Sequence, residues 1–321
     1  MNLFDSGTHE LYSKVFARLR ELEDIFSVYR EGADLFRVNQ NAGLSPEKVR
    51  PELIEVLINA MEIAEKSGGA FDPTIGPLTR LWSIGDGSQH DGLRNSQHDS
   101  QQERSRIPDE EAIREALPLV NYKHVEIDLE EGTVFLIRPF MALDMGAIAK
   151  GFAADEIARI LKEEGVERGI IDLGGDIYAL GAREDGTYWR IGIQDPRNYR
   201  GSFFGILELI NKSVVTSGVY ERFFLEDDIQ YHHILSTENG FPVDNGLLSV
   251  TVVAEKAIDA DALSTAAFAL GWELGLELIA QVPGAAGIFV SGDLSIRMSE
   301  GLDEYFTLTT SEFTLVPNTG E

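Results

Sequence analysis

Apolar residues recur at helical spacing in two segments near the start of the chain. One stripe runs through residues 9–28, and a second runs through 51–64, before the helix-breaking Ser-Gly-Gly at 67–69. One face of an α-helix repeats every three to four residues, so both stripes predict amphipathic helices. Two further helices are predicted over 148–164 and 261–280.

From residue 122 onward the sequence pattern changes to short runs rich in β-branched and aromatic residues. Runs of this kind, separated by tight turns such as Glu131-Gly132, are typical of antiparallel hairpins. The predicted strands occupy 123–128, 133–138, 168–173, 176–181, 188–194, 205–210, 213–217, 230–235, 248–254, 286–290 and 304–309. Strands in runs with helices in clusters indicate an α+β fold, with an antiparallel-sheet core and flanking helices, and not a regular βαβ alternation.

The segment 85–106 interrupts this pattern because it is almost wholly polar and rich in Gln, Ser, His and Asp. It predicts a solvated insertion loop. His90 and His98 within it are possible metal ligands, but solvated loop histidines are the commoner case. A chain of 321 residues can form one large domain over 1–321, or two closely packed lobes.

Acidic residues outnumber basic ones by 54 to 27, which gives a formal net charge of −27. Such a surface repels nucleic acid and anionic lipid, so neither is expected as a partner. A phosphorylated ligand would need a metal ion or a local cationic group to enter. The absence of cysteine excludes disulfides and Cys-based metal sites. The first eight residues lack the regions of a signal peptide, as expected of a cytoplasmic protein or of a mature exported one.

Two segments far apart in the sequence combine polar groups with small residues at predicted helix starts. They are Asp-Met-Gly-Ala-Ile-Ala-Lys-Gly at 144–151 and Asp-Ala-Asp-Ala-Leu-Ser-Thr at 259–265. Small residues let a ligand approach the backbone, and a helix N-terminus favours anionic oxygens. Asp261 and Thr265 fall on one helical face, where a carboxylate and a hydroxyl can share a hard cation. The segments therefore predict a site for a phosphate-bearing ligand held through a divalent metal. The alternative for Asp261 is a carboxylate that only stabilises a helix N-terminus.

Three other elements are weak signals singly: a helix end and loop at 68–74, a turn at 172–176 and a strand end at 216–222. Their order along the chain is more informative. The sequence resembles the ApbE family, the Mg²⁺-dependent FAD:protein FMN transferases. The matching elements are 26–29, 69–74, 144–151, 173–176, 216–218 with Tyr220 and Arg222, 233–234 with Gly240 and Pro242, and 261–265.

The resemblance implies an ApbE-like, T-fold-related architecture and a Mg²⁺ site. In this sequence the implied metal ligands are the backbone oxygen of Ala147, the carboxylate of Asp261 and the hydroxyl of Thr265, with Ser264 beside them. The choice is chemically reasonable because Mg²⁺ prefers oxygen ligands and few protein groups.

The resemblance also implies a set of residues that contact the FAD substrate. They are Tyr29, Ala70, Phe71, Asp72, Asp144, Lys150, Gly174, Gly175, Ser217, Gly218, Arg222, His233 and Ile234. Lys150 is the expected counter-charge for the diphosphate, the alternative being an exposed helix lysine. His233 is the expected general base because an unperturbed histidine titrates near neutral pH, at about 6.5. The alternative is a strand histidine packed against His232. With Asp261, these two form the predicted catalytic group.

The implied reaction cleaves the diphosphate of FAD, releases AMP and joins FMN through its phosphate to a Thr or Ser of an acceptor flavoprotein. If water replaces that hydroxyl, the same site is a Mg²⁺-dependent FAD pyrophosphatase; a second alternative is a non-catalytic FAD carrier. The resemblance further implies a periplasmic or other extracytoplasmic location, with the mature form held at the membrane by a lipid anchor.

Two departures from the family pattern stand out. Ser236-Thr237 replaces an Asp-Pro pair that the family usually shows, which puts any role of that acidic position in doubt. The family also begins with a strand that ends in a Met-Gly-Thr-like turn. Met1 falls part-way through that region, so this strand and its ligand contact are expected to be missing.

Overall fold

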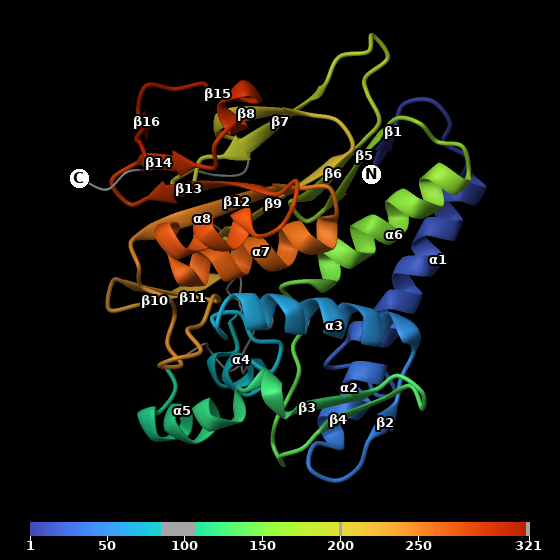
Figure 1. Ribbon diagram of the computed structural model, residues 1–321, viewed down its shortest axis with the longest axis vertical. Coiled ribbons are helices and arrows are strands. Elements are labelled where there is room, and N and C mark those ends of the chain that lie inside the picture. The colour runs from blue at the N-terminus through green and yellow to red at the C-terminus, as the bar shows by residue number, and fades with distance from the viewer. Residues whose placement is uncertain (85–106, 199–200, 319–321) are drawn as a thin grey trace, which may run out of the picture.

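An eight-stranded sheet forms the centre of the computed structural model, which describes residues 1–84, 107–198 and 201–318 (Figure 1). Its neighbouring strands are antiparallel except for the last pair, β14 and β16. In spatial order its strands are β1 (Asn2–Leu3), β5 (Gly169–Leu173), β6 (Asp176–Leu180), β9 (Lys212–Gly218), β12 (Leu247–Ala254), β13 (Ala286–Ser291), β14 (Ser295–Met298) and β16 (Thr314–Leu315).

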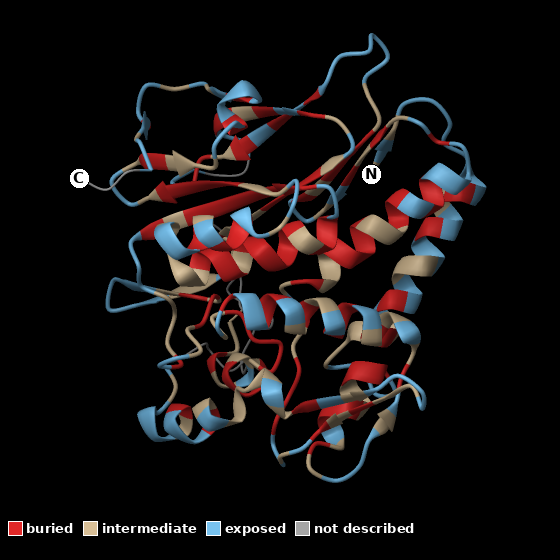
Figure 2. Ribbon diagram, in the orientation of Figure 1, coloured by how far each residue is buried: buried red, intermediate tan, exposed pale blue. Residues whose placement is uncertain are grey.

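Helices cover one face of this sheet and a small sheet covers the other (Figure 1). The helices of this layer are α1 (His9–Phe26), α3 (Pro51–Lys66), α6 (Ala149–Glu163), α7 (Ala257–Leu270) and α8 (Trp272–Ala280). The small sheet has the order β15 (Phe306–Leu308), β8 (Phe203–Leu209), β7 (Trp189–Gln194). Strand β12 lies between the two layers and is buried along nearly its whole length (Figure 2). This double burial explains its almost continuous apolar sequence.

A third group of elements packs beneath α3 and closes one side of the molecule (Figure 1). It contains α2 (Asp34–Gln40), α4 (Gly76–Trp82), α5 (Glu110–Ala116) and a sheet of β2 (Glu47–Lys48), β4 (Thr133–Leu136) and β3 (Val125–Asp128). A separate two-stranded hairpin, β10 (Phe223–Glu226) and β11 (Ile229–His232), projects beside α4.

The predicted α+β class is confirmed, and a strand is present at each of the predicted strand ranges. The prediction of one helix over 261–280 is wrong. The segment forms two helices, because Gly271 adopts a φ of +82° between them, and the first helix already begins at Ala257. Asp261 therefore lies in the second turn of α7 and not at its N-terminus.

A short strand, β1, is present in the region where a strand was expected to be missing, and it pairs with β5 through Asn2 and Leu3. The expected loss of the ligand contact stays a prediction. The predicted insertion loop at 85–106 lies outside the described residues. Among the described helices, none combines the length and apolar character needed to cross a bilayer.

Helices α6 and α7 meet closely at their N-terminal ends. A Cβ on Gly151 would lie 2.3 Å from the carbonyl oxygen of Ala257, so a glycine is required for this approach. Helix α7 has no side-chain cap of its own. Instead, Asp155 of α6 accepts the N–H groups of Ala257 at 2.8 Å and Ile258 at 3.0 Å. One helix thus caps the other, as an N-cap carboxylate would.

We expect Asp155→Ala to lower the free energy of unfolding by about 1 kcal/mol, because two N–H groups of α7 lose their acceptor. Asp155→Asn keeps one amide oxygen as an acceptor and should lose less. Denaturant titration of the three proteins measures the difference. An alanine variant as stable as the wild type would show that this cap does not hold α7.

Burial raises the pKa of Asp155 from 3.8 to about 6, although the two N–H groups oppose the rise. The folded chain therefore binds this proton more tightly than the unfolded chain. The resulting stabilisation is full below the unfolded pKa and is lost as the pH rises through the folded pKa. The Asp155→Asn variant cannot ionise, so its stability should not fall with this titration. We therefore expect the free energy of unfolding of the variant, measured relative to that of the wild type, to be higher at about pH 7.5 than at about pH 5. Unfolding measured at both pH values tests this, and a constant difference would contradict it.

Candidate active site

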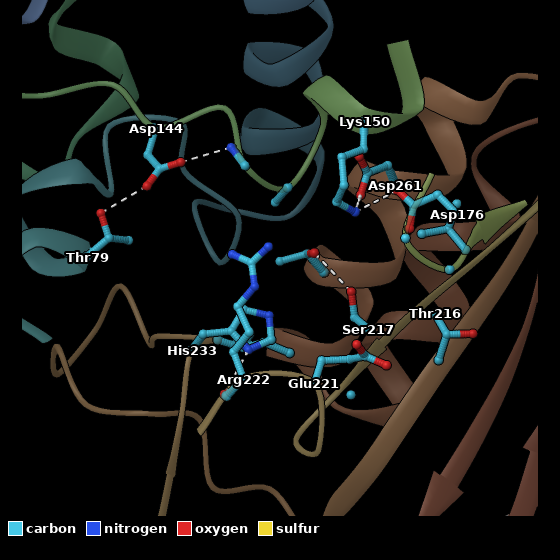
Figure 3. A pocket seen from close by; sticks show the side chains of 18 of the residues that line it. Thr79, Asp144, Lys150, Asp176, Thr216, Ser217, Glu221, Arg222, His233 and Asp261 are labelled. Atoms are coloured by element: carbon cyan, nitrogen blue, oxygen red, sulfur yellow. Dashed lines mark hydrogen bonds and ion pairs between the residues drawn. The ribbon is translucent and has the colours of Figure 1, made fainter. Parts of the chain in front are cut away.

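A cavity of about 990 Å³ opens where the starts of α6 and α7 meet the ends of β6 and β9 (Figure 3). Its other walls come from the loop before α4, from α4 itself and from the base of the β10–β11 hairpin. Segments that are far apart in the sequence therefore contribute side chains to one space. This is the arrangement expected of a ligand site.

The side chain of Lys150 and the buried carboxylates of Asp176 and Asp261 form a charge cluster at one end of the cavity (Figure 3). The Lys150 Nζ lies 2.6 Å from Asp176 Oδ2 and 3.5 Å from Asp261 Oδ1. Burial opposes the charged lysine, but the carboxylates of Asp261 and Asp176 outweigh it and raise the pKa of Lys150. Burial raises the pKa of Asp261 to about 6, despite the opposing effects of Lys150 and of a bond from Gly151 N at 2.9 Å. The cluster holds two acidic groups against one cation.

Three hydroxyls form a second cluster beside these charges. The Ser217 Oγ lies 2.8 Å from Ser264 Oγ and 3.0 Å from Thr265 Oγ1, so strand β9 is tied to helix α7. Ser264 is fully buried, donates to the carbonyl of Asp261 at 2.9 Å and does not line the cavity. Ser264 therefore holds Ser217 and the α7 backbone in place and does not itself face the cavity.

Ala147, Asp261 and Thr265 all line the cavity. Their donors are a carbonyl, a carboxylate and a hydroxyl, which are hard oxygen ligands of the kind that Mg²⁺ accepts. Among the described residues no three His, Cys, Asp or Glu side chains gather in a metal-binding group. A site with one carboxylate fits Mg²⁺, which usually keeps several waters and takes phosphate oxygens. The donor set therefore fits Mg²⁺.

Asp144 shapes the loop that leads into α6. Its Oδ1 accepts the N–H of Gly146 at 2.8 Å, and its Oδ2 accepts the hydroxyl of Thr79 at 2.9 Å (Figure 3). Its own N–H donates to the carbonyl of Pro73 at 2.8 Å. Asp144 thereby ties the loop that carries Ala147 to helix α4.

The Ala70-Phe71-Asp72 segment forms the neighbouring wall. Asp72 is buried and accepts three bonds, from the N–H and hydroxyl of Thr74 and from the N–H of Tyr122. Burial raises the pKa of Asp72 although these bonds oppose it. Asp72 therefore holds the turn in shape, while Phe71 packs into the core and also lines the cavity.

Gly174 and Gly175 form the two-residue turn between β5 and β6, where Leu173 pairs with Asp176. Both have positive φ, +73° and +110°, a backbone conformation that glycine adopts without strain. The turn places Asp176 opposite Lys150, which accounts for a glycine pair at this position.

Arg222 and His233 face each other at the base of the hairpin (Figure 3). The N–H of His233 donates to the carbonyl of Arg222 at 3.1 Å, and the His233 Nδ1 lies 3.2 Å from the same oxygen. Burial, together with the Arg222 charge, lowers the pKa of His233 to about 3. This pKa lies well below the unperturbed value on which the expectation of a general base rested. A neutral ring with its proton on Nδ1 still presents Nε2 as an acceptor.

His233 was alternatively expected to pack against His232. In the structure, hydrogen bonds to other groups orient both rings. The His232 Nε2 lies 2.9 Å from the carbonyl of Val243, and its Nδ1 accepts the N–H of Ile234. His232 is buried against Phe268, whereas His233 lines the cavity.

The structure brings every predicted ligand-contacting residue to this cavity, and Tyr29 lies at its exposed edge. Sequence reasoning missed Thr79, Arg80, Asp176 and Thr237, which also line it. Thr79 and Arg80 belong to the short helix α4, which has no periodic signal. Asp176 belongs to one of the matched motifs. An acidic residue directly after the glycine pair could therefore have indicated that it lines the site.

Solved structures of flavin transferases share this fold. A structure titled as the ApbE protein of Thermotoga maritima is 31% identical, with a TM-score of 0.80 over 92% of this chain and 91% of that one. A structure of the flavin transferase ApbE from Vibrio cholerae is 26% identical, with a TM-score of 0.79 over 94% of this chain and 91% of that one. The fold is thus that of the ApbE proteins.

The sequence comparisons agree. The family model described as ApbE family matches residues 3–289, and the chain belongs to this family. An FAD:protein FMN transferase of Treponema pallidum (strain Nichols) is 35% identical over 96% of this chain and 84% of that protein. One from Klebsiella pneumoniae (strain 342) is 35% identical over 92% of this chain and 86% of that protein.

We expect Asp144→Ala to weaken FAD binding roughly tenfold, because the loop that carries Ala147 loses the two hydrogen bonds of the Asp144 side chain and keeps only the backbone bond to Pro73. Thr79→Val removes only one of the two bonds and should weaken binding less. Titration followed by flavin fluorescence measures the dissociation constants. Equal affinity in Asp144→Ala and wild type would contradict a role for this loop in binding.

Proposed function

We propose that this protein is a Mg²⁺-dependent FAD:protein FMN transferase. It cleaves the diphosphate of FAD, releases AMP and joins FMN through its phosphate to a Thr or Ser hydroxyl of an acceptor protein. Family membership and the names of the relatives support the overall reaction. The single observation that carries the proposal for this chain is the cavity in which Lys150, Asp261 and Thr265 meet.

The charges of the cavity suit a diphosphate in an otherwise acidic protein. Lys150, Arg222 and Arg80 line the cavity of a chain whose formal net charge is −27. Positive groups in such a cleft attract an anion that the rest of the surface repels. A diphosphate oxygen can take the place of a carboxylate as the partner of Lys150, since the lysine has two acidic partners and can release one.

Ala147, Asp261 and Thr265 are the residues that would hold Mg²⁺. When bound, the ion would neutralise negative charge on the diphosphate and favour departure of AMP. Ser217 and Ser264 would fix the Thr265 hydroxyl, because the three form one hydrogen-bonded cluster.

The transfer is a displacement at the phosphorus atom of the FMN half. The acceptor hydroxyl oxygen forms the new P–O bond, the bond to the bridging oxygen breaks, and AMP leaves with that oxygen. The proton of the hydroxyl passes to a base, and we assign this role to His233, which lines the cavity. A histidine with a lowered pKa is a weak base, which suits a loose transition state in which the proton leaves late. Lys150 and Arg222 would stabilise charge on the departing phosphate.

The reaction is tested by incubating the protein with FAD and Mg²⁺, with and without a Thr-bearing acceptor peptide, and measuring AMP and FMN-peptide. AMP that appears only with the peptide, together with FMN-peptide, supports transfer. Equal AMP in both samples with no FMN-peptide would show an FAD pyrophosphatase, and no AMP in either would show a carrier. Both results would refute the proposal.

We expect Asp261→Asn to lower Mg²⁺-dependent AMP release roughly a hundredfold, because the only carboxylate of the proposed ion site is lost. Asp259→Asn is the matched control: Asp259 lies on the same helix, is half-buried and does not line the cavity, so its replacement should leave turnover unchanged. AMP release by Asp261→Asn at the wild-type rate would remove Asp261 from the site.

A further inference from the structure

The β10–β11 hairpin is a two-stranded ribbon with no third strand among the described residues. Its tip is the two-residue turn Asp227-Asp228, in which both residues have positive φ, as in a type I′ turn. Its base carries Arg222 and His233, which line the cavity. The hairpin projects from the body of the molecule beside α4 (Figure 1). A strand edge with unpaired backbone groups thus leads directly to the proposed reaction site.

The register shows which backbone groups point outward. Arg222 and His233 form a hydrogen-bonded pair, and pairs alternate along an antiparallel ladder. Phe224 with Tyr231 is then the next bonded pair. Phe223 with His232 and Leu225 with Gln230 are non-bonded pairs, so the N–H and C=O groups of Phe223 and Leu225 face away from β11. No other described strand pairs with them.

The rest of the hairpin is already occupied near its base. On one face Trp82 stacks on Tyr231 at 5.7 Å and lies 6.3 Å from Phe224. On the β11 side, the side chain of Gln230 donates to the carbonyl of Val219, and His232 bonds Val243. Near the tip, the N–H of Ile107 lies 3.5 Å from the side-chain Oε2 of Glu226. Within the described part of the chain, the outward backbone groups of Phe223 and Leu225 on β10 are therefore the ones left open for a partner.

The chemistry of the surroundings limits that partner. Glu226, Asp227 and Asp228 make the tip acidic, and the whole chain carries a net charge of −27. Nucleic acid and a second copy of this chain are both repelled. A neutral or basic polypeptide in extended form meets neither obstacle and can bond the outward N–H and C=O groups.

We propose that the free edge of β10 binds the acceptor polypeptide as an added β-strand, which delivers its Thr or Ser hydroxyl to the cavity at Arg222 and His233. This inference rests on the proposed transferase function. A strand rises about 3.3 Å per residue, so the hydroxyl lies roughly 10 Å from the acceptor residue that pairs with Leu225. The acceptor end nearer the tip carries neutral or basic side chains.

The test compares Leu225→Pro with Leu225→Ala. Proline removes the outward N–H without breaking a bond inside the hairpin, and edge positions tolerate it. Alanine keeps that N–H and loses only a side chain that is 65% exposed. The probe is a set of decapeptides with one fixed central Thr and varied flanks, and the best substrate of the wild type is used throughout. We expect Leu225→Pro to lower kcat/KM for this peptide roughly tenfold relative to Leu225→Ala, with the dissociation constant for FAD unchanged.

A second measurement uses the wild-type protein alone, so it does not depend on the folding of a variant. The chosen peptide is N-methylated at one backbone position at a time. Strand addition predicts loss of transfer at alternate positions only, because every second N–H faces β10. Losses without this period of two would overturn the inference.

The outcomes separate the inference from the function on which it rests. FMN-peptide formed equally well by Leu225→Pro and Leu225→Ala refutes strand addition and leaves the transferase in place. AMP release by wild type with no FMN on any peptide refutes the transferase, and the strand addition with it.

Discussion

The contact between the N-terminal ends of α6 and α7 is the constraint on which the site depends. Gly151 lets the two helices approach until only a hydrogen atom fits between them. Asp155 then caps α7 from α6, and Asp261 of α7 accepts the N–H of Gly151. Each helix satisfies backbone groups at the start of the other, so neither can shift alone. This exchange brings Lys150 and Asp261, which are far apart in the sequence, to 3.5 Å.

The same contact sets the electrostatics of the cavity. Burying Asp261 and Asp176 disfavours their charged forms, and Lys150 compensates only in part, since two carboxylates share one cation. Such a cluster is incomplete without further positive charge. A divalent cation that binds together with a diphosphate would supply this positive charge. The phosphate oxygens would then pair with Lys150. An acidic protein can thus bind an anionic substrate, because the cation neutralises the charge of both the carboxylates and the diphosphate.

Much of the fold could be predicted from the sequence, where the period of the apolar residues decides it. The predicted helices at 9–28 and 51–64 and the predicted strands differ from the structure only at their ends. The short strands β1, β2, β10, β14 and β16 were not predicted. The start of α7 could not be predicted, because Lys256 is no capping residue and the cap comes from Asp155 on another helix. The site residues of the matched motifs lie together as expected, but Thr79 and Arg80 sit on a helix too short to show a period. The pKa of His233 could not be foreseen either, since it depends on burial and on Arg222, which only the folded chain supplies.

The departure at Ser236-Thr237 has a structural consequence of the same kind. Thr237 donates its hydroxyl to the carbonyl of Gly69 at 2.8 Å, and so joins the loop after the hairpin to the loop that carries Phe71 and Asp72. A hydroxyl makes this link without adding a negative charge to a cavity that already holds Asp144, Asp176 and Asp261. The hairpin borders the same cavity through Arg222 and His233. The acceptor strand proposed for the outer edge of β10 would therefore reach the cavity at these two residues.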